Sequence, residues 1–289
     1  MKPKVLVTCL QMQNYLKDNI SNDFDFSMPK LESQYFRSQE IIKLSRAHDY
    51  LVAGDDELDG DFFLESQHLK AVIRWGVGVD NVDFEAARKA GVQVRNTPGV
   101  FAVDVAELAI AYMLMMARMP HRLDSKVRLG GWPRMLGTTL QGKTLGIYGY
   151  GTIGQKIAQF GEAFEMTIVA CDPALVIGLT QFEVAPSIDA LFSKSDFVVL
   201  SAPLTAKTRH VVNSTSLSGP LDGASLINVS RGGLVEESAV VAKLKSGELG
   251  GYASDVFEVE PLPINSELRK FKNVILGSHN ASNTVEGVS

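Results

Sequence analysis

The sequence predicts an α/β protein of two domains, each built on a doubly wound parallel sheet. Short β-branched runs alternate with helical patterns along most of the chain, which is typical of parallel strands joined by crossover helices. The length of 289 residues and the hydrophobic content of 45% suit about two globular domains. A glycine-rich turn, LGIYGYGTIG at 145–154, comes only at mid-chain, so a whole domain precedes it.

The first domain is predicted to span residues 1–97 and to hold a substrate. Its expected strands are 4–9, 49–53, 70–75 and 92–96, and its expected helices are 38–47 and 83–90. The boundary near 96–98 is marked by a proline and a glycine rather than by a flexible spacer.

A strongly apolar helix, AVDVAELAIAYMLMMARM, is expected next, at 102–119. Apolar residues occupy nearly every face of its roughly five turns, so we expect burial on all sides. Burial that complete favours a subunit interface, and hence a homodimer. The alternative is an internal core helix in a monomer.

The second domain is predicted to span 98–280. Its expected strands are 144–148, 167–171, 196–201, 224–228, 251–255 and 273–277, and its expected helices are 152–163, 187–194 and 236–246. No self-similarity at a fixed period is found.

Composition excludes several classes of function. The 28 Lys and Arg against 33 Asp and Glu give a net charge of −5, which argues against a nucleic-acid partner. The apolar run at the N-terminus is too short for a secretory signal, and no stretch approaches the ~20 apolar residues of a membrane span, so we expect a cytoplasmic protein. Cys9 and Cys171 lie in apolar runs without a C-x-x-C pattern, which predicts core residues rather than a metal site or a disulfide.

The glycine-rich turn predicts a Rossmann-like dinucleotide site because of its strand–turn–helix context; the bare pattern is weak. Gly149 permits the tight turn, Gly151 lets backbone approach a pyrophosphate, and Gly154 lets helix and strand pack closely. The pyrophosphate would meet the N–H groups of Thr152 and Ile153 at the positive end of the helix dipole.

The next strand ends in VACDP, which places Asp172 eighteen residues beyond Gly154. A carboxylate there can accept hydrogen bonds from both ribose hydroxyls and repels a 2′-phosphate, so we expect NAD rather than NADP. The alternative is a plain turn residue before Pro173.

Three later segments carry reactive side chains at or just past strand ends: INVSRGGLVEE (227–237), SDVFEVEP (254–261) and LGSHNAS (276–282). Taken singly, each has an ordinary interpretation as a surface cation, a solvated loop glutamate or a satisfied histidine. Together, downstream of a dinucleotide motif, they indicate a catalytic site, because open α/β sheets bind ligands at these strand ends.

From about Leu69 to Thr284 the sequence resembles the D-isomer-specific 2-hydroxyacid dehydrogenases, and within that family the D-3-phosphoglycerate dehydrogenases most. The resemblance is carried by several specific motifs in order, namely RWGVGVDNVD (74–83), RNTPG (95–99), VAELAIAYMLMMAR (105–118), the glycine turn with its aspartate, APLTAKTRHVVN (202–213) and the three segments above. It implies an active site in the cleft between the domains, and residues 281–289 returning towards the first one.

The resemblance implies a catalytic role for three residues. His279 is the acid/base that exchanges the hydroxyl proton, and imidazole has the pKa for that work near neutrality. Glu260 bonds the other ring nitrogen and fixes the tautomer. Arg231 offers a rigid donor fork to the substrate carboxylate.

Further contacts are implied on both domains. The loop Gly76-Val77-Gly78 is expected to present backbone N–H groups to the substrate carboxylate, unless its glycines serve the turn alone. Asp255 is expected at the nicotinamide carboxamide, with Pro203 and Thr208 flanking the cofactor.

The sequence departs from the resemblance at the expected binding site of the substrate phosphate. Arg74 and Arg134 match two phosphate-binding arginines, the second reaching into a partner subunit, but a third arginine is replaced by Asp55 and Asp56, which would repel a phosphate. Arg74 and Arg134 could instead be ordinary ion-pairing residues. Ser278 also replaces a proline that the family typically has before its histidine. The sequence ends before the C-terminal helix that usually crosses back onto the first domain, so either the sequence is truncated or that domain is less well covered than usual.

The sequence therefore predicts an NAD-dependent oxidoreductase that transfers a hydride between the nicotinamide and C2 of a small D-2-hydroxy acid resembling 3-phosphoglycerate. Glycerate, hydroxypyruvate or glyoxylate are the alternative substrates. An NAD(H)-sensing interaction protein is a second class, against which the Arg231, Glu260 and His279 set argues.

Overall fold

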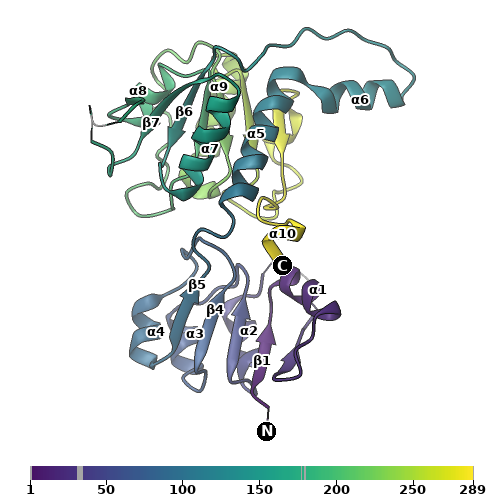
Figure 1. Ribbon diagram of the computed structural model, residues 1–289, viewed down its shortest axis with the longest axis vertical. Helices are drawn as coiled ribbons and strands as arrows, with labels where there is room; N and C mark the ends of the chain where they lie inside the picture. The colour runs from purple at the N-terminus through teal and green to yellow at the C-terminus, as the bar shows by residue number, and fades with distance from the viewer. Residues whose placement is uncertain (1, 31–34, 177, 179, 289) are drawn as a thin grey trace. The chain divides into compact units, whose positions relative to one another are not determined.

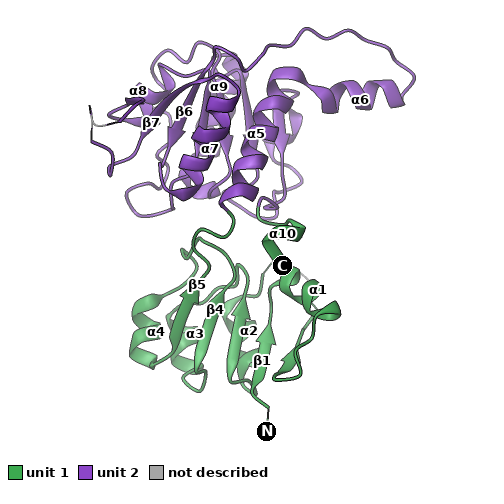
Figure 2. Cartoon of the chain, viewed as in Figure 1, with its two compact units in different colours: residues 1–101, 282–289 green, residues 102–281 purple. Residues whose placement is uncertain are grey.

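The chain forms two compact units in the computed structural model, which describes residues 2–30, 35–176, 178 and 180–288 (Figure 1). Unit 1 comprises residues 1–101 and 282–289, and unit 2 comprises 102–281 (Figure 2). The first division therefore falls four residues after the boundary predicted at 97.

Unit 1 contains a five-stranded parallel sheet in the order β2-β1-β3-β4-β5. The strands are β1 (Lys4–Val7), β2 (Asp25–Ser27), β3 (Tyr50–Ala53), β4 (Ala71–Arg74) and β5 (Gln93–Asn96). The helices are α1 (Leu10–Asp18), α2 (Ser38–Ser45), α3 (Gly60–Glu65), α4 (Phe84–Ala90) and α10 (Val285–Val288). The chain winds outward from β1 in both directions, and Leu51, Phe62 and Phe63 are completely buried in the core.

Unit 2 contains a seven-stranded parallel sheet in the order β12-β11-β10-β9-β6-β7-β8. The strands are β6 (Thr144–Tyr148), β7 (Thr167–Cys171), β8 (Glu183–Val184), β9 (Phe197–Leu200), β10 (Ser225–Asn228), β11 (Gly251–Ser254) and β12 (Val274–Leu276). The α-helices are α5 (Ala102–Arg118), α6 (Pro120–Arg128), α7 (Thr152–Ala163), α8 (Ile188–Phe192) and α9 (Glu237–Ser246), and two short 3₁₀ helices are η1 (Gly232–Leu234) and η2 (Glu267–Lys270).

The order of strands in unit 2 reverses between β6 and β9. From β6 the chain proceeds outward to β7 and β8, then returns to β9 and proceeds the other way to β12. Ligands of doubly wound sheets bind outside the carboxyl ends of the strands at this switch point. The glycine-rich turn follows β6, so the fold places the predicted dinucleotide motif at the switch point.

Helix α5 is only partly buried within the single chain. It packs beside α7 and over the sheet (Figure 1), with Val105, Ala109 and Met113 buried. Val103 is 45% exposed, however, and Glu107 and Ala111 are exposed as well. These three residues are spaced by four and share one face, so the alternative of a core helix buried within one chain is wrong, whereas burial of this face in a homodimer stays a prediction.

Helix α6 and the segment that follows it project from the rest of unit 2 (Figure 1). No residue of α6 is buried. Beyond it, Leu129, Trp132 and Leu136 are 88%, 86% and 97% exposed. Residues 120–136, which we name the arm, therefore present large apolar side chains to solvent.

Candidate functional site

Each glycine of the turn after β6 has its own physical requirement. Gly149 has a φ of +93°, and a Cβ added there would lie 2.5 Å from the backbone nitrogen of Ala202 after β9. A Cβ on Gly154 would overlap the carbonyl oxygen of Gly149. Gly151, at the N-cap of α7, has no atom within 4 Å of its added Cβ. The first and third glycines therefore serve the fold, and the second leaves open space where a ligand's phosphate could approach the N–H groups of Thr152 and Ile153.

Asp172 lies at the carboxyl end of β7, beside the glycine turn. Its Oδ2 accepts a hydrogen bond from the backbone N–H of Tyr150 (2.7 Å), and its Oδ1 accepts one from Ala174 (2.8 Å). The carboxylate thus ties the turn to the next strand, which supports the turn interpretation of this residue. Because each carboxylate oxygen can accept more than one hydrogen bond, these contacts are compatible with ribose binding.

Pro203 and Thr208 belong to one turn that follows β9 at the switch point. The Thr208 hydroxyl donates to the Pro203 carbonyl oxygen (2.7 Å) and accepts from the backbone N–H of Thr205 (2.8 Å). Thr208 therefore shapes the turn on which Pro203 lies.

Arg231 lies directly before η1, in the turn after β10. The Asn228 side chain donates to the Arg231 carbonyl oxygen (2.9 Å), and the Arg231 guanidinium donates to the Ser230 carbonyl oxygen (2.8 Å). A Cβ added at Gly232 would lie 2.5 Å from the backbone nitrogen of Glu258. The arginine turn and the loop that carries Glu260 are therefore in direct backbone contact, which only glycine permits.

The structure brings His279 and Glu260 together. The histidine Nδ1 lies 2.7 Å from the glutamate Oε2, and the two side chains are 20% and 19% exposed. The other carboxylate oxygen, Oε1, accepts from the backbone N–H of Phe257 (2.8 Å). Because a carboxylate accepts, Nδ1 carries the proton, and a neutral ring presents Nε2 as a base.

Asp255 has a role that the sequence did not reveal. Its carboxylate is 1% exposed, and its Oδ2 accepts from the backbone N–H groups of Asn280 and Ala281, both at 2.8 Å. Its carbonyl oxygen accepts from the N–H of His279 (2.6 Å), whose φ is +55°. Asp255 thus holds the turn that presents the histidine in a left-handed conformation that few side chains adopt.

Arg74, in unit 1, is directed into the protein. Its side chain is 5% exposed, pairs with Asp55 and donates to the carbonyl oxygen of Trp75. Its guanidinium lies against the Cα of Gly76, where a Cβ would overlap it. This geometry supports the ion-pair interpretation of Arg74 over a phosphate-binding one.

The neighbouring glycine loop is fixed to β5. The N–H of Gly76 donates to the Thr97 hydroxyl (2.9 Å), and the Asn96 amide donates to the carbonyl oxygen of Val77 (2.9 Å). The donors that the loop could offer a carboxylate are therefore those of Val77 and Gly78.

The expectation that Asp56 repels a substrate phosphate is wrong. The residue is 1% exposed, and its carboxyl group accepts from the Thr8 hydroxyl and from the backbone N–H groups of Phe36 (2.8 Å) and Gly54 (3.0 Å). Burial raises the pKa of this carboxyl group. Asp56 is enclosed by the loops of unit 1, whereas its neighbour Asp55 is 36% exposed.

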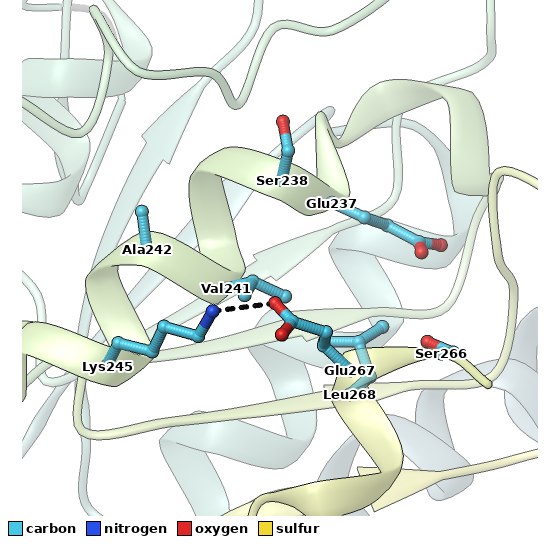
Figure 3. Close-up of a pocket in the computed structure, with 8 residues that line it drawn as sticks. All are labelled: Glu237, Ser238, Val241, Ala242, Lys245, Ser266, Glu267 and Leu268. Carbon is cyan, nitrogen blue, oxygen red and sulfur yellow. Dashed lines mark hydrogen bonds and ion pairs between the residues drawn. The ribbon is translucent and has the colours of Figure 1, made fainter.

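One cavity among the described residues lies apart from all of these residues, between α9 and η2 (Figure 3). The Lys245 ammonium group crosses it to Glu267 (2.7 Å), and Glu237 lines one end. None of the predicted site residues lines this cavity. The described residues also contain no His, Cys, Asp and Glu cluster suited to a metal ion, and no helix long and apolar enough to cross a bilayer.

Residues 110–281 match the family model of the D-isomer specific 2-hydroxyacid dehydrogenase, NAD binding domain. A hydroxypyruvate reductase of Thermotoga maritima is 37% identical over 262 residues, which cover 89% of this chain and 85% of that protein. A D-3-phosphoglycerate dehydrogenase of Methanocaldococcus jannaschii is 36% identical over 255 residues, which cover 86% of this chain and 48% of that protein.

A solved structure extends the similarity to the whole chain. The NADPH-dependent glyoxylate/hydroxypyruvate reductase of Sinorhizobium meliloti, in complex with NADP and malonate, is 30% identical with a TM-score of 0.85. The alignment covers 100% of this chain and 89% of that one. The two-domain α/β fold predicted from the sequence is thereby confirmed.

The open space at Gly151 generates a test. Replacing Gly151 with Ala should change the free energy of unfolding by less than about 1 kcal/mol, because the methyl group meets no neighbour. It should weaken NADH binding at least about tenfold, because the methyl group occupies the approach to the helix. Gly149→Ala is the contrasting variant and should unfold at a lower denaturant concentration. Unchanged NADH affinity in Gly151→Ala would place the dinucleotide elsewhere.

Proposed function

Because this chain belongs to the D-isomer specific 2-hydroxyacid dehydrogenase family, and its relatives include a hydroxypyruvate reductase and a glyoxylate/hydroxypyruvate reductase, we propose that it interconverts a small unphosphorylated 2-keto acid and its D-2-hydroxy acid. The observation that carries this proposal is the hydrogen bond between His279 Nδ1 and Glu260 Oε2. A bound nicotinamide dinucleotide supplies or accepts the hydride, and the protein must move one proton and hold one carboxylate.

His279 is the proton donor in the direction of reduction. An imidazolium has N–H groups on both nitrogens, so Nε2 can donate to the forming C2 alkoxide while Nδ1 stays bonded to Glu260. The Glu260 carboxylate stabilises the imidazolium and keeps the ring in one orientation. In the direction of oxidation, the same Nε2 accepts the hydroxyl proton.

Arg231 binds the substrate carboxylate in this proposal. Its guanidinium can donate two parallel hydrogen bonds, which fix both the position and the plane of the carboxylate. The contact between Gly232 and the 257–258 peptide supports this role, because it keeps the arginine turn against the loop that holds Glu260. In unit 1, the N–H groups of Val77 and Gly78 are the proposed further donors to a carboxylate.

The residues after β6 and β7 fit a dinucleotide, and we propose that NAD is preferred. Thr152 and Ile153 would face the pyrophosphate beside the open side of Gly151. Asp172 stands one strand away and would accept from the ribose hydroxyls, while its charge disfavours a 2′-phosphate. Pro203 and Thr208 are proposed to border the nicotinamide end, whereas Asp255, which is 1% exposed, is proposed to support the His279 turn rather than to contact the carboxamide.

The ion pair between Asp55 and Arg74 supports an unphosphorylated substrate. Arg74 stands where the resemblance places a phosphate-binding arginine, but its charge is balanced by Asp55 and its side chain is 5% exposed. A phosphate dianion would gain little attraction from Arg74 and would be repelled by the partly exposed carboxylate of Asp55. Hydroxypyruvate and glyoxylate carry a single carboxylate and avoid this repulsion.

We also propose a homodimer formed through α5 and the arm. Val103 on α5 and Leu129, Trp132 and Leu136 on the arm are large apolar side chains that the single chain leaves exposed, and such side chains often mark a surface that a partner covers. Arg134 lies among them on the arm, is exposed, and is proposed to reach a partner's substrate site.

Replacing His279 with Ala should lower kcat by about 100- to 10,000-fold, because proton transfer loses its donor. NADH affinity should be unchanged, since the glycine turn is intact. The measurement is NADH oxidation with hydroxypyruvate, beside NADH titration by fluorescence. His68→Ala, in unit 1, is the matched control. Undiminished turnover in His279→Ala would remove the acid/base role.

Hydroxypyruvate should be reduced with a kcat/KM at least about tenfold above that of its 3-phosphorylated analogue, because of the Asp55 charge. Asp55→Ser should reduce the difference in kcat/KM between the two acids, because it removes the carboxylate and releases Arg74 from the ion pair. Equal kcat/KM for both acids in the wild type would contradict the substrate proposal.

Hydroxypyruvate reduction should show a higher kcat/KM with NADH than with NADPH, and Asp172→Ala should reduce that preference. A wild-type preference for NADPH would contradict the cofactor proposal.

Light scattering should give a mass of about twice the 31.4 kDa of one chain. Trp132→Ser combined with Leu136→Ser should lower that mass, because both side chains are proposed to lie in the interface. Leu64→Ser is the control, since Leu64 is 64% exposed on unit 1. A monomeric wild-type protein would refute the dimer.

A further inference from the structure

Two glutamates outside the predicted catalytic set lie 21 positions apart in the sequence and are joined by two reciprocal hydrogen bonds. The backbone N–H of Glu237, the first residue of α9, donates to the Glu258 carboxylate (3.1 Å). The backbone N–H of Glu258 donates in turn to the Glu237 carboxylate (2.8 Å). Each side chain therefore accepts from the other's backbone, and we name these two residues the glutamate clamp.

The glutamate clamp holds the loop from which Glu260 reaches His279. Within residues 257–260, the N–H of Phe257 donates to Glu260 Oε1, and the N–H of the very next residue, Glu258, donates to Glu237. Consecutive backbone donors of this loop are thus each fixed by a glutamate. The other oxygen of Glu260 lies 2.7 Å from Nδ1 of His279.

A second contact ties the clamp to the turn that carries Thr208. The Glu258 Oε1 lies 2.8 Å from Nε2 of His210, and the His210 N–H donates to the carbonyl oxygen of Gly233 (2.8 Å). Gly232 packs its Cα directly on the 257–258 peptide. The loop of Glu260 is therefore held by α9, by the arginine turn and by the turn after β9.

We propose that Glu237 and Glu258 are positioning residues, which fix the 257–260 loop and so hold the Glu260 carboxylate in contact with the His279 ring during proton transfer. This inference rests on the proposed function of the same site. Neither residue needs to touch substrate or cofactor for this role.

The charges of the clamp are consistent with a positioning role. Burial raises the pKa of Glu237, and the nearby carboxylates of Glu258 and Glu260 raise it further, while the hydrogen bond from the Glu258 backbone lowers it. Bringing three carboxylates together is unfavourable unless each receives donors. What the loop requires of Glu237 is a hydrogen-bond acceptor at this position, which an amide oxygen can supply as well.

The test compares Glu237→Ala, Glu237→Gln, Glu258→Ala and the double alanine variant. In Figure 3 the Glu237 carboxylate points away from the pair of Lys245 and Glu267, so Lys245→Ala is a control on the same helix that leaves the clamp intact. Glu237→Ala should lower kcat for hydroxypyruvate reduction about 10- to 100-fold, because a displaced acid/base group has a large effect on rate.

Three readouts separate positioning from a general loss of structure. NADH affinity should stay within about twofold of wild type. Glu237→Gln should retain kcat, because its amide oxygen still accepts from Glu258. The double alanine variant should lose no more kcat than the worse of the two single variants, because the effects of residues that act together are not additive. Equal losses in Glu237→Ala and Lys245→Ala, or multiplied losses in the double variant, would overturn the inference.

Histidine-ring ¹⁵N spectra provide a readout that does not need turnover. The His279 signals should change in Glu237→Ala and remain as in wild type in Glu237→Gln and Lys245→Ala. Unchanged His279 signals in Glu237→Ala would overturn the inference even if the wild-type protein is active. An inactive wild type with the expected spectral changes would contradict the proposed function alone.

Discussion

The bond between Glu260 and His279 depends on backbone that is held in place elsewhere in unit 2. His279 adopts a left-handed conformation, and the buried carboxylate of Asp255 accepts the next two N–H groups of its turn. Gly277 precedes this turn with no room for a Cβ, which would overlap both Asp255 and the Tyr112 hydroxyl. Each hydrogen bond to a charged group contributes about 1.5–3 kcal/mol. That stabilisation is sufficient to hold a strained histidine, whose own cost is about 1–3 kcal/mol.

The same constraint extends across the switch point of the sheet. Loops that leave neighbouring parallel strands crowd together at the carboxyl ends, and here they meet with backbone against backbone. Gly149 lies against Ala202, and Gly232 lies against the 257–258 peptide. Side chains are excluded at these contacts, so the loops can approach closely enough for polar groups from β10, β11 and β12 to share one end of the sheet. Gly151 differs from the others because its free side faces no protein atom.

The fold was predictable where local patterns are strong. The strand 144–148 and the helix 152–163 were predicted with the bounds that the structure shows. The strand is a buried apolar run, and the glycine turn separates its end from the start of the helix. Helix α1 was missed because only Gln13 and Leu16 of its residues are buried, and its N-cap Cys9 makes no side-chain cap. Helix α6 was missed because it buries nothing within the chain. Composition could not show which face of α5 packs on α7 and which face the single chain leaves exposed.

The site was less accessible to sequence reasoning than the fold. Motif order alone singled out His279 and Glu260, whose contact is present in the structure. Asp56 was placed wrongly because adjacent aspartates look alike in sequence, and only the loops of unit 1 decide which one is enclosed. The bonds of Asp255 and of Glu237 join residues more than 20 positions apart, so no local pattern reveals them. For the glutamate clamp, the sequence offered one local signal, which was Glu237 as the second of two adjacent glutamates after the arginine turn.

In the proposed function, Glu260 fixes the neutral His279 ring with its proton on Nδ1, and Nε2 exchanges the substrate proton. ¹⁵N NMR of the histidine rings tests it most directly, recorded at a pH where the ring is neutral and assigned with His279→Gln. Nδ1 of His279 should give the protonated signal and Nε2 the unprotonated one. A ring protonated on Nε2 would contradict it.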